Sequence, residues 1–294
     1  MTDYLETKVD AHGCSFQIRI EGGGPPLLLL HGFTGSIETM APLATTLRNQ
    51  FSVISVDLPG HGRTFLFKDG GSYDFSDCVR GLGGILDQLN IDKCFICGYS
   101  MGGRTALLFA VRYPFRVSAL AAIGASGGIE EREERIKRRK DDEALACSLE
   151  SGGIEQFTQR WMNHPLFAGQ QKLGKEFLAA ARRQRLQNDP FSLAFSLRTM
   201  GTGSQKPLYQ SLGQLDIPMM FLAGEEDRKF YDLAVKLQKS CARGYSRFIR
   251  KSGHAAHLEN LAMTAETLAL FFNRYTTEEM QSSDPVNIEI LSQQ

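Results

Sequence analysis

Ser100 lies in the pentapeptide Gly98-Tyr99-Ser100-Met101-Gly102 and could act as a nucleophile or a base. The pentapeptide fits G-x-S-x-G, and it follows an apolar run typical of a strand and precedes a run typical of a helix. In that context the glycines permit a sharp turn that presents the hydroxyl above the end of a sheet. A serine in an ordinary turn or helix cap would show the same short pattern, so the interpretation depends on partners elsewhere.

A serine hydroxyl becomes reactive when a base accepts its proton and a third group orients that base. One apolar run ends at Asp227 in "GEEDRKF", and the next ends at His254 in "SGHAAHLEN". In open α/β sheets, functional groups gather beyond the carboxyl ends of the strands. The chain order Ser, Asp, His is also the one expected after such a turn. We therefore predict the triad Ser100–Asp227–His254.

Other carboxylates are weaker candidates because of their positions. Asp216 precedes its strand, so it belongs to the wrong end of the sheet, and Asp232 falls inside the following helix. Glu225 and Glu226 are nearer rivals to Asp227, although they lie closer to the strand and can face elsewhere.

The remaining histidines near these motifs are expected to be structural. His31 and His61 lie in turns, where a hydrogen bond to the backbone is the common role. His257 is expected one turn into the last helix, in a capping or packing role. The role of His164 is left open.

An oxyanion hole requires two backbone N–H groups near the serine. The residue after the serine, Met101, supplies one of them. The loop "LLLLHGFTG" follows an earlier strand and offers the Phe33 amide beside the flexible Gly32. We predict Phe33 and Met101 as the two donors.

Arg104 lies four residues after Ser100, one turn along the helix that begins there. From that position its side chain can point back toward the floor of the pocket. A guanidinium there would suit a substrate that bears a carboxylate. A salt bridge on the helix surface is the alternative.

Alternating strands and helices are expected to position these residues. Short β-rich runs, several of them continuously apolar, occupy 15–20, 26–33, 51–58, 93–100 and 117–124, with helical patterns at 38–50, 75–89 and 101–113. This alternation predicts an α/β fold with a mostly parallel sheet flanked by helices. Strands resume at 217–227 and 245–253, with helices from 231 and over 257–275.

The segment between these two blocks is expected to be all-helical. We predict a core formed by residues 1–125 and 211–275, a helical lid over 126–210, and a polar, disordered tail over 276–294. An insertion of this length is too patterned to be a simple loop.

Composition excludes several classes of protein. Lysine plus arginine and aspartate plus glutamate both number 33, so no overall field favours nucleic acid or an anionic membrane. No signal peptide or membrane span is expected, and six scattered cysteines do not form a disulfide framework. Cys94 and Cys97 form CxxC on an expected strand, where they would face opposite sides. We expect a cytoplasmic protein.

The motifs "HGFTGS", "DLPGHGRT", "GYSMGGRTAL", "GEEDRKF" and "GHAAHLEN" together resemble those of the α/β-hydrolase fold over nearly the whole chain. One departure is Arg63-Thr64, where members of the fold commonly carry a small residue and then serine. Arg63 is expected near the mouth of the site.

Further motifs resemble one family within this fold. "EERIKRRKDDEALA", "WMNHPLF", "RLQND" and "LRTMGTGSQKPLY" are similar to the 2-succinyl-6-hydroxy-2,4-cyclohexadiene-1-carboxylate (SHCHC) synthases of menaquinone and phylloquinone biosynthesis. These motifs cover the core and lid from about Leu27 to Asn260. The resemblance implies a small polycarboxylate substrate, loss of pyruvate without water, and neither a metal nor an organic cofactor.

The resemblance also implies the residues that bind substrate. Arg104, Arg138 and Arg185 would hold its carboxylates, while Tyr99 and Trp161, with Phe167 beside them, would line the pocket. Arg135 and Arg139 are the alternatives to Arg138, because they face other directions on the same helix. Ser100, activated by His254, would then remove a ring proton instead of attacking a carbonyl.

Three rival interpretations remain at this point. A hydrolase of carboxylate-bearing esters, thioesters or carbon–carbon bonds would use the same triad. A binding protein could retain the triad without turnover. The charged run "EEREERIKRRKDDE" could dock a protein partner, although a solvated lid helix explains it more simply.

Overall fold

The computed structural model describes residues 4–67, 73–277 and 280. Within these residues the strands form one sheet in the order β1-β2-β4-β3-β6-β7-β8-β9, with β5 paired to β2. Their bounds are β1 Tyr4–Ala11, β2 Cys14–Glu21, β3 Pro26–Leu30, β4 Ser52–Val56, β5 Phe65–Leu66, β6 Cys94–Tyr99, β7 Val117–Ile123, β8 Met219–Gly224 and β9 Gly244–Ile249.

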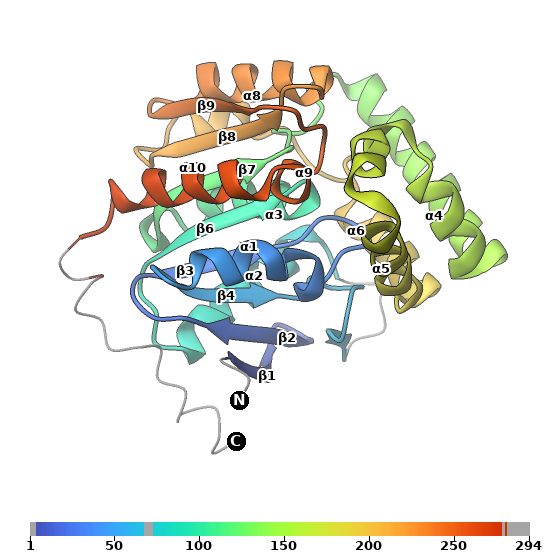
Figure 1. Cartoon of the computed structure of the whole chain (residues 1–294), viewed down its shortest axis with the longest axis horizontal. Helices are drawn as coiled ribbons and strands as arrows, with labels where there is room; N and C mark the ends of the chain where they lie inside the picture. The colour runs from blue at the N-terminus through green and yellow to red at the C-terminus, as the bar shows by residue number, and fades with distance from the viewer. Residues whose placement is uncertain (1–3, 68–72, 278–279, 281–294) are drawn as a thin grey trace.

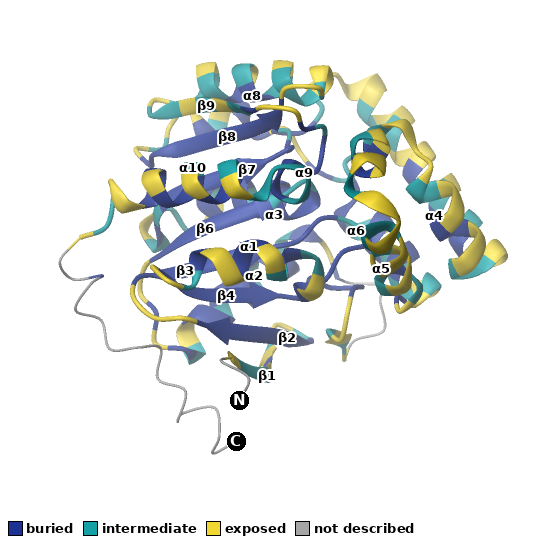
Figure 2. Cartoon of the chain, viewed as in Figure 1, coloured by how far each residue is buried: buried dark blue, intermediate teal, exposed yellow. Residues whose placement is uncertain are grey.

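The central strands are parallel and covered on both faces. β4, β3, β6, β7, β8 and β9 pair in parallel, whereas β1, β2 and β5 add antiparallel pairs at one edge. Every residue of β3, β4 and β8 is buried, as Figure 2 shows for the middle of the sheet. Continuous apolar runs are typical of such strands. The predicted α/β fold class is therefore confirmed.

Helices pack on both sides of this sheet. α1 Ile37–Leu47 and α10 Leu261–Asn273 cover one face, and α2 Phe75–Gln88, α3 Met101–Arg112 and α8 Arg228–Ser240 cover the other. Cys94 and Cys97 contribute to these two opposite cores, as expected for CxxC on a strand. The short elements are η1 Pro114–Arg116, α7 Tyr209–Leu212 and α9 Ala256–Glu259.

The segment between β7 and β8 is helical. It comprises α4 Arg132–Met162, η2 Pro165–Leu173, α5 Gly174–Leu186 and α6 Pro190–Met200. Figure 1 shows these helices together at the edge of the core toward which the parallel strands run. They bury a small core of their own, formed by Ala146, Leu149, Phe157, Leu193, Ala194 and Leu197. We call α4, η2, α5 and α6 the lid.

Several boundaries differ from those that the sequence predicts. β1 was not expected, because it is a half-exposed edge strand whose residues alternate little in polarity. The expected last helix over 257–275 is two helices, separated where the Asn260 side chain caps α10 by accepting from Met263 N. Most of the predicted tail, 278–279 and 281–294, lies outside the described residues.

Among the residues that the structure describes, no helix combines the length and the apolar character that crossing a bilayer requires.

Candidate active site

Ser100 occupies a strained turn between β6 and α3. Its φ is 52° and its ψ is −107°, a conformation that non-glycine residues rarely adopt. The flanking glycines make the turn possible. A Cβ on Gly98 would lie 2.2 Å from the carbonyl oxygen of Gly102, and one on Gly102 would lie 2.4 Å from that of Leu30. The turn therefore lifts the Ser100 hydroxyl beyond the end of the sheet.

The structure brings Ser100, His254 and Asp227 together in one hydrogen-bonded chain. His254 Nε2 lies 3.1 Å from Ser100 Oγ, and His254 Nδ1 lies 2.8 Å from Asp227 Oδ2. Asp227 is also the N-cap of α8, where its Oδ1 accepts from Phe230 N at 3.3 Å. This arrangement can hold the imidazole with Nε2 free to accept the serine proton.

The rival carboxylates have other partners. Glu226 forms a 2.6 Å ion pair with Lys172 of the lid, and Glu225 accepts a 3.4 Å hydrogen bond from the backbone of Lys251. Asp216 pairs with Arg243, and Asp232 pairs with Arg228 on the surface of α8. None of them contacts His254 in the described residues.

The two backbone amides predicted as oxyanion donors belong to segments next to Ser100. A Cβ on Gly32 would lie 3.4 Å from Ser100 Cβ, so the Gly32–Phe33 loop passes directly beside the serine. Met101 N begins α3 immediately after Ser100. Within the described residues, neither Phe33 N nor Met101 N has a hydrogen-bond acceptor. Both N–H groups are therefore available to an oxygen of a bound molecule.

Glu259, which sequence reasoning missed, supports the loop that carries His254. Its carboxylate accepts from Gly253 N at 2.7 Å and from Ala255 N at 3.1 Å, the two amides that flank His254. The lid packs tightly on it, since a Cβ on Gly169 would lie 1.9 Å from Glu259 Oε2. Its place in "GHAAHLEN", five residues after the histidine, is the only signal in the sequence.

The remaining histidines do not join the triad. His31 accepts from Leu58 N at 2.9 Å, and His61 Nδ1 lies 3.2 Å from the carbonyl oxygen of Pro59, so both are structural as expected. His257 lies in the short helix α9 instead of one turn into a long one. Burial, with a contribution from His254, lowers the pKa of His257 to about 3. His164 caps η2 by accepting from Leu166 N.

Aromatic side chains of the lid and the core pack against one another close to His254 of the triad. The Trp161 ring lies 5.4 Å from that of Phe33 and 5.5 Å from that of Phe167, and Phe167 lies 6.2 Å from His254. Tyr99 lies 5.3 Å from His254 on the other side. Trp161 Nε1 is buried without a hydrogen-bond partner among the described residues.

Arg185 is a buried cation of the lid. Only 8% of its surface is exposed, and its Nη1 donates to the carbonyl of Ala181 at 3.1 Å. Its Nε is buried and has no partner in the part of the chain that the structure describes, nor does any carboxylate pair with it there. Burial lowers its pKa, and Tyr99 is near enough to oppose that shift. Arg185 is therefore a buried cation whose charge interacts with Tyr99, the residue that precedes Ser100.

Arg104 is also buried, which excludes the salt bridge on the helix surface. Its Nη1 donates to Gln205 Oε1 at 3.1 Å, and its Nη2 donates to the carbonyl of Met200 at 2.8 Å. Burial, together with the nearby charge of Arg138, lowers the pKa of Arg104 to about 10. Gln205, which the sequence did not single out, has a buried Nε2 without a partner among the described residues.

The three candidate arginines of α4 have different partners, and Arg138 is the one whose charge acts on Arg104. Its Nε donates to Asp142 Oδ1 at 2.7 Å, and the buried Asp142 also accepts from Gly203 N at 3.0 Å. Arg135 instead donates to the carbonyl oxygens of Ile129 and Glu130, which lie just before α4, and Arg139 is exposed. Of these three arginines, Arg138 is therefore the one that pairs with a buried carboxylate of the lid.

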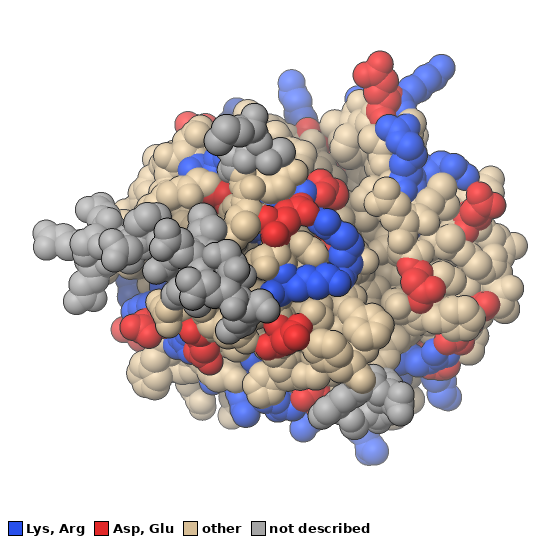
Figure 3. All heavy atoms as spheres, turned by 90° about the horizontal axis from the view of Figure 1, so that it is seen from below, with Lys and Arg blue, Asp and Glu red and all other residues tan. Residues whose placement is uncertain are grey.

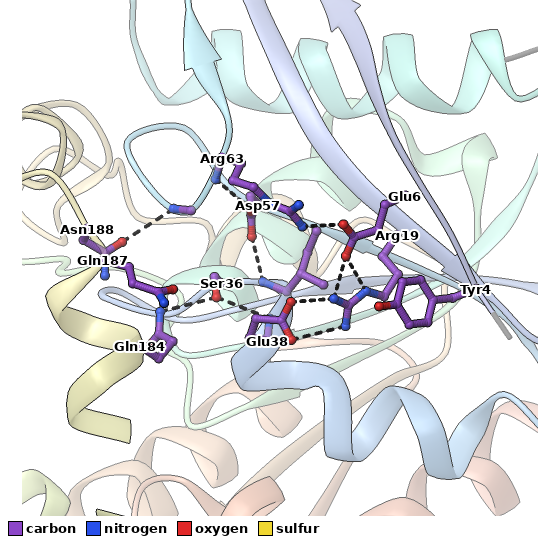
Figure 4. Close-up of a pocket in the computed structure, with 12 residues that line it drawn as sticks. Tyr4, Glu6, Arg19, Ser36, Glu38, Asp57, Arg63, Gln184, Gln187 and Asn188 are labelled. Carbon is purple, nitrogen blue, oxygen red and sulfur yellow. Dashed lines mark hydrogen bonds and ion pairs between the residues drawn. The ribbon is translucent and has the colours of Figure 1, made fainter. Parts of the chain in front are cut away.

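Arg63 lies at a separate cavity of about 350 Å³, between the β1–β2 edge and the end of α5. Figure 4 shows its side chain bonded to Glu6, which also binds Arg19. Basic and acidic side chains are interspersed over the face seen in Figure 3. The expectation that Arg63 lies at the mouth of the triad pocket has no contact to support it.

Comparison with known proteins identifies relatives of this chain over most of its length. A family model described as the alpha/beta hydrolase fold matches residues 25–261. A putative SHCHC synthase of Bacillus subtilis is 35% identical over 88% of this chain and 95% of its own length. An SHCHC synthase of Salmonella paratyphi B is 32% identical over 84% and 93%. The structure of MenH from S. aureus has a TM-score of 0.81 and 30% identity, and the match covers 94% of this chain and all of MenH.

Proposed function

Because this chain belongs to the SHCHC synthases within the α/β-hydrolase fold, we propose that it eliminates pyruvate from the SEPHCHC intermediate to give SHCHC in menaquinone or phylloquinone biosynthesis. The fold alone would not support this choice, since the same architecture carries many reactions. The argument therefore rests on the family and on the residues around Ser100.

The buried, unpaired guanidinium of Arg185 is the observation that carries the proposal. A cation held out of water without a counter-charge is unfavourable unless a ligand supplies that charge. A substrate carboxylate at Arg185 would fill its open Nε position and neutralise it. Arg104 and Arg138 are proposed to bind further carboxylates of the same substrate. A neutral ester would leave Arg104 and Arg185 without such a partner, whereas Arg138 keeps its ion pair with Asp142.

Ser100 is proposed to act as a base in this reaction. His254, oriented by Asp227, takes the hydroxyl proton, and the resulting alkoxide removes a proton from a ring carbon of the substrate. The electrons of that C–H bond form a new ring double bond, the existing double bond shifts, and the C–O bond to the pyruvate unit breaks. Pyruvate leaves as its enolate and takes a proton from His254. No water and no acyl-enzyme take part.

The amides of Phe33 and Met101 are proposed to stabilise the negative charge that develops on an oxygen during the elimination. Tyr99, Trp161 and Phe167 are proposed to line the pocket and exclude water from it. Trp161 Nε1 can also donate to substrate, because it lacks another acceptor among the described residues.

A cytoplasmic location is also proposed. All six cysteines are free thiols, which agrees with a reducing compartment.

Pyruvate release from freshly generated SEPHCHC tests the reaction, with cleavage of a short-chain p-nitrophenyl ester measured in parallel. We expect rapid pyruvate release by the native enzyme, its loss in Ser100→Ala, and a large decrease in Arg138→Ala. Ester cleavage that needs Ser100 but not Arg138, without pyruvate release, would identify a hydrolase instead. Product formed once per protein molecule, without turnover, would identify a binding protein.

A further inference from the structure

Two amide side chains at the end of α5 bind the loop that carries Phe33. Gln184 Nε2 and Asn188 Nδ2 each donate to the carbonyl oxygen of Thr34 at 3.2 Å. Gln184 Nε2 also lies 3.3 Å from Ser36 Oγ, an interaction that Figure 4 shows. These side chains therefore hydrogen-bond the loop at Thr34, one residue after the proposed oxyanion donor Phe33.

The loop needs such support because its backbone is strained. Thr34 has a φ of 65°, in the left-handed region that β-branched residues rarely occupy. Conformations of this kind persist where the surrounding structure holds them in place. Thr34 is 2% exposed, and two donors on its carbonyl come from the lid.

Asn188 joins this loop to two further segments. Its Nδ2 also donates to the carbonyl of Arg185 at 3.1 Å, and its Oδ1 accepts from Gly62 N at 3.5 Å. The side chain is 5% exposed, so these bonds lie out of water. One residue thus links the Phe33 loop, the loop around Gly62, and the end of the helix that carries Arg185.

We propose that Asn188 and Gln184 are positioning residues that hold the oxyanion donor of Phe33 at a fixed separation from the carboxylate-binding Arg185. The inference rests on the proposed roles of Phe33 and Arg185. Neither residue touches the reacting atoms, and both act through the Thr34 carbonyl. Because an oxyanion contact forms fully only in the transition state, its loss lowers kcat more than it raises KM.

A double-variant cycle tests the proposal. The variants are Gln184→Ala, Asn188→Ala and the pair, with Gln187→Ala as the matched control. Gln187 lines the same cavity as Gln184 and Asn188, the one at Arg63. It is exposed and makes no side-chain hydrogen bond within the described residues. Each single variant leaves one donor on Thr34, so we expect kcat to fall by about fivefold or less. The pair leaves none, and we expect a loss of about 10²-fold, the effect of removing one oxyanion donor.

Two further measurements keep the test independent of folding defects and of the proposed reaction. Asn188→Asp preserves the shape of the side chain but places a carboxylate oxygen against the Thr34 carbonyl oxygen in place of the donor. Because this adds repulsion to the loss of one hydrogen bond, we expect kcat about tenfold lower with KM within threefold. Hydrogen exchange of residues 31–36 should accelerate in the pair and not in Gln187→Ala.

The outcomes separate the two proposals. A native enzyme that releases no pyruvate would refute the proposed function. The positioning role would then be judged on ester-cleavage kcat and on hydrogen exchange. Native pyruvate release, with kcat of both the pair and Asn188→Asp within twofold of native and unchanged exchange, would overturn the positioning role alone. A lower melting temperature with unchanged kcat would likewise reduce these residues to a structural role.

Discussion

Gly32→Ala tests the oxyanion loop with a single methyl group. The added Cβ would lie 2.8 Å from two ring carbons of Tyr99, which is closer than side-chain carbons approach in folded proteins. The Tyr99 ring cannot move aside easily, because its centroid lies 4.3 Å from that of the buried His257 and 5.3 Å from that of His254. The Gly32–Phe33 loop must therefore shift by several tenths of an ångström away from Ser100.

A shift of that size is enough to disable the Phe33 donor. Oxyanion-hole donors act within about 2.7–3.1 Å of the charged oxygen, and the loss of one lowers kcat by about 10²–10³-fold. We expect an effect in this range for Gly32→Ala, with KM nearly unchanged. Overpacking of this kind also destabilises a protein by about 1–3 kcal/mol.

Steady-state pyruvate release and thermal unfolding, measured on the same preparation, distinguish the two effects. Gly23→Ala is the matched control, because a methyl group there would meet no atom within 4 Å. The reasoning fails if Gly32→Ala unfolds at a lower temperature yet keeps kcat within threefold of the native value. That result would mean that the Phe33 amide does not bind the developing charge.

Three other perturbations have defined outcomes. Arg185→Met should raise KM about 10–100-fold, because the substrate loses a cationic partner, and should stabilise the unliganded protein, because an unpaired buried charge is removed. The matched variant Arg182→Met, at an exposed position, should do neither. Unchanged KM of Arg185→Met in steady-state assays would contradict the role of Arg185. Glu259→Gln replaces one carboxylate oxygen by an NH2 group, which faces an amide N–H of Gly253 or Ala255 and cannot accept from it. We expect this variant to lower kcat about tenfold. Native kcat with a lower melting temperature would show a purely structural role. In the folded protein the pKa of His257 is about 3, so the side chain is neutral, whereas in the unfolded chain it takes up a proton below about pH 6.5. The free energy of unfolding should therefore fall as the pH drops below about 6.5, by up to about 1.4 kcal/mol per pH unit. Urea unfolding between pH 7 and 4.5 should show a shallower fall for His257→Phe, and an equal slope would refute this assignment.

The sequence was sufficient to predict the triad residues because each follows a recognisable strand. Ser100, Asp227 and His254 come after β6, β8 and β9, and parallel strands place their carboxyl ends at one edge. The structure brings these three side chains within hydrogen-bond distance, although their chemical roles remain proposals. The alternation of strands and helices similarly indicated the fold.

Contacts between distant segments could not be predicted in this way. The guanidinium of Arg104 binds Gln205 and Met200, about a hundred residues further along the chain, and nothing in the sequence indicates these partners. Glu259 acts on backbone amides, which leave no trace in residue types. Asn188 was visible only as one letter of "RLQND". The contacts of Arg104, Glu259 and Asn188 depend on how the lid packs on the core. Motifs and hydrophobic periodicity in the sequence do not reveal that packing.

In the proposed binding mode, the two buried cations, Arg104 and Arg185, also link ligand binding to the stability of the whole protein. The folded state keeps them dehydrated without a carboxylate partner among the described residues, whereas the unfolded chain hydrates them fully. A polyanion bound at these two arginines, as proposed above, would stabilise the fold by mass action, by about 2.7 kcal/mol at one hundred times its dissociation constant. Citrate and similar buffer anions should consequently behave as competitive inhibitors that raise the melting temperature. Screening compounds by thermal shift would favour polycarboxylates, and a choice of buffer would alter the apparent affinity of every one of them.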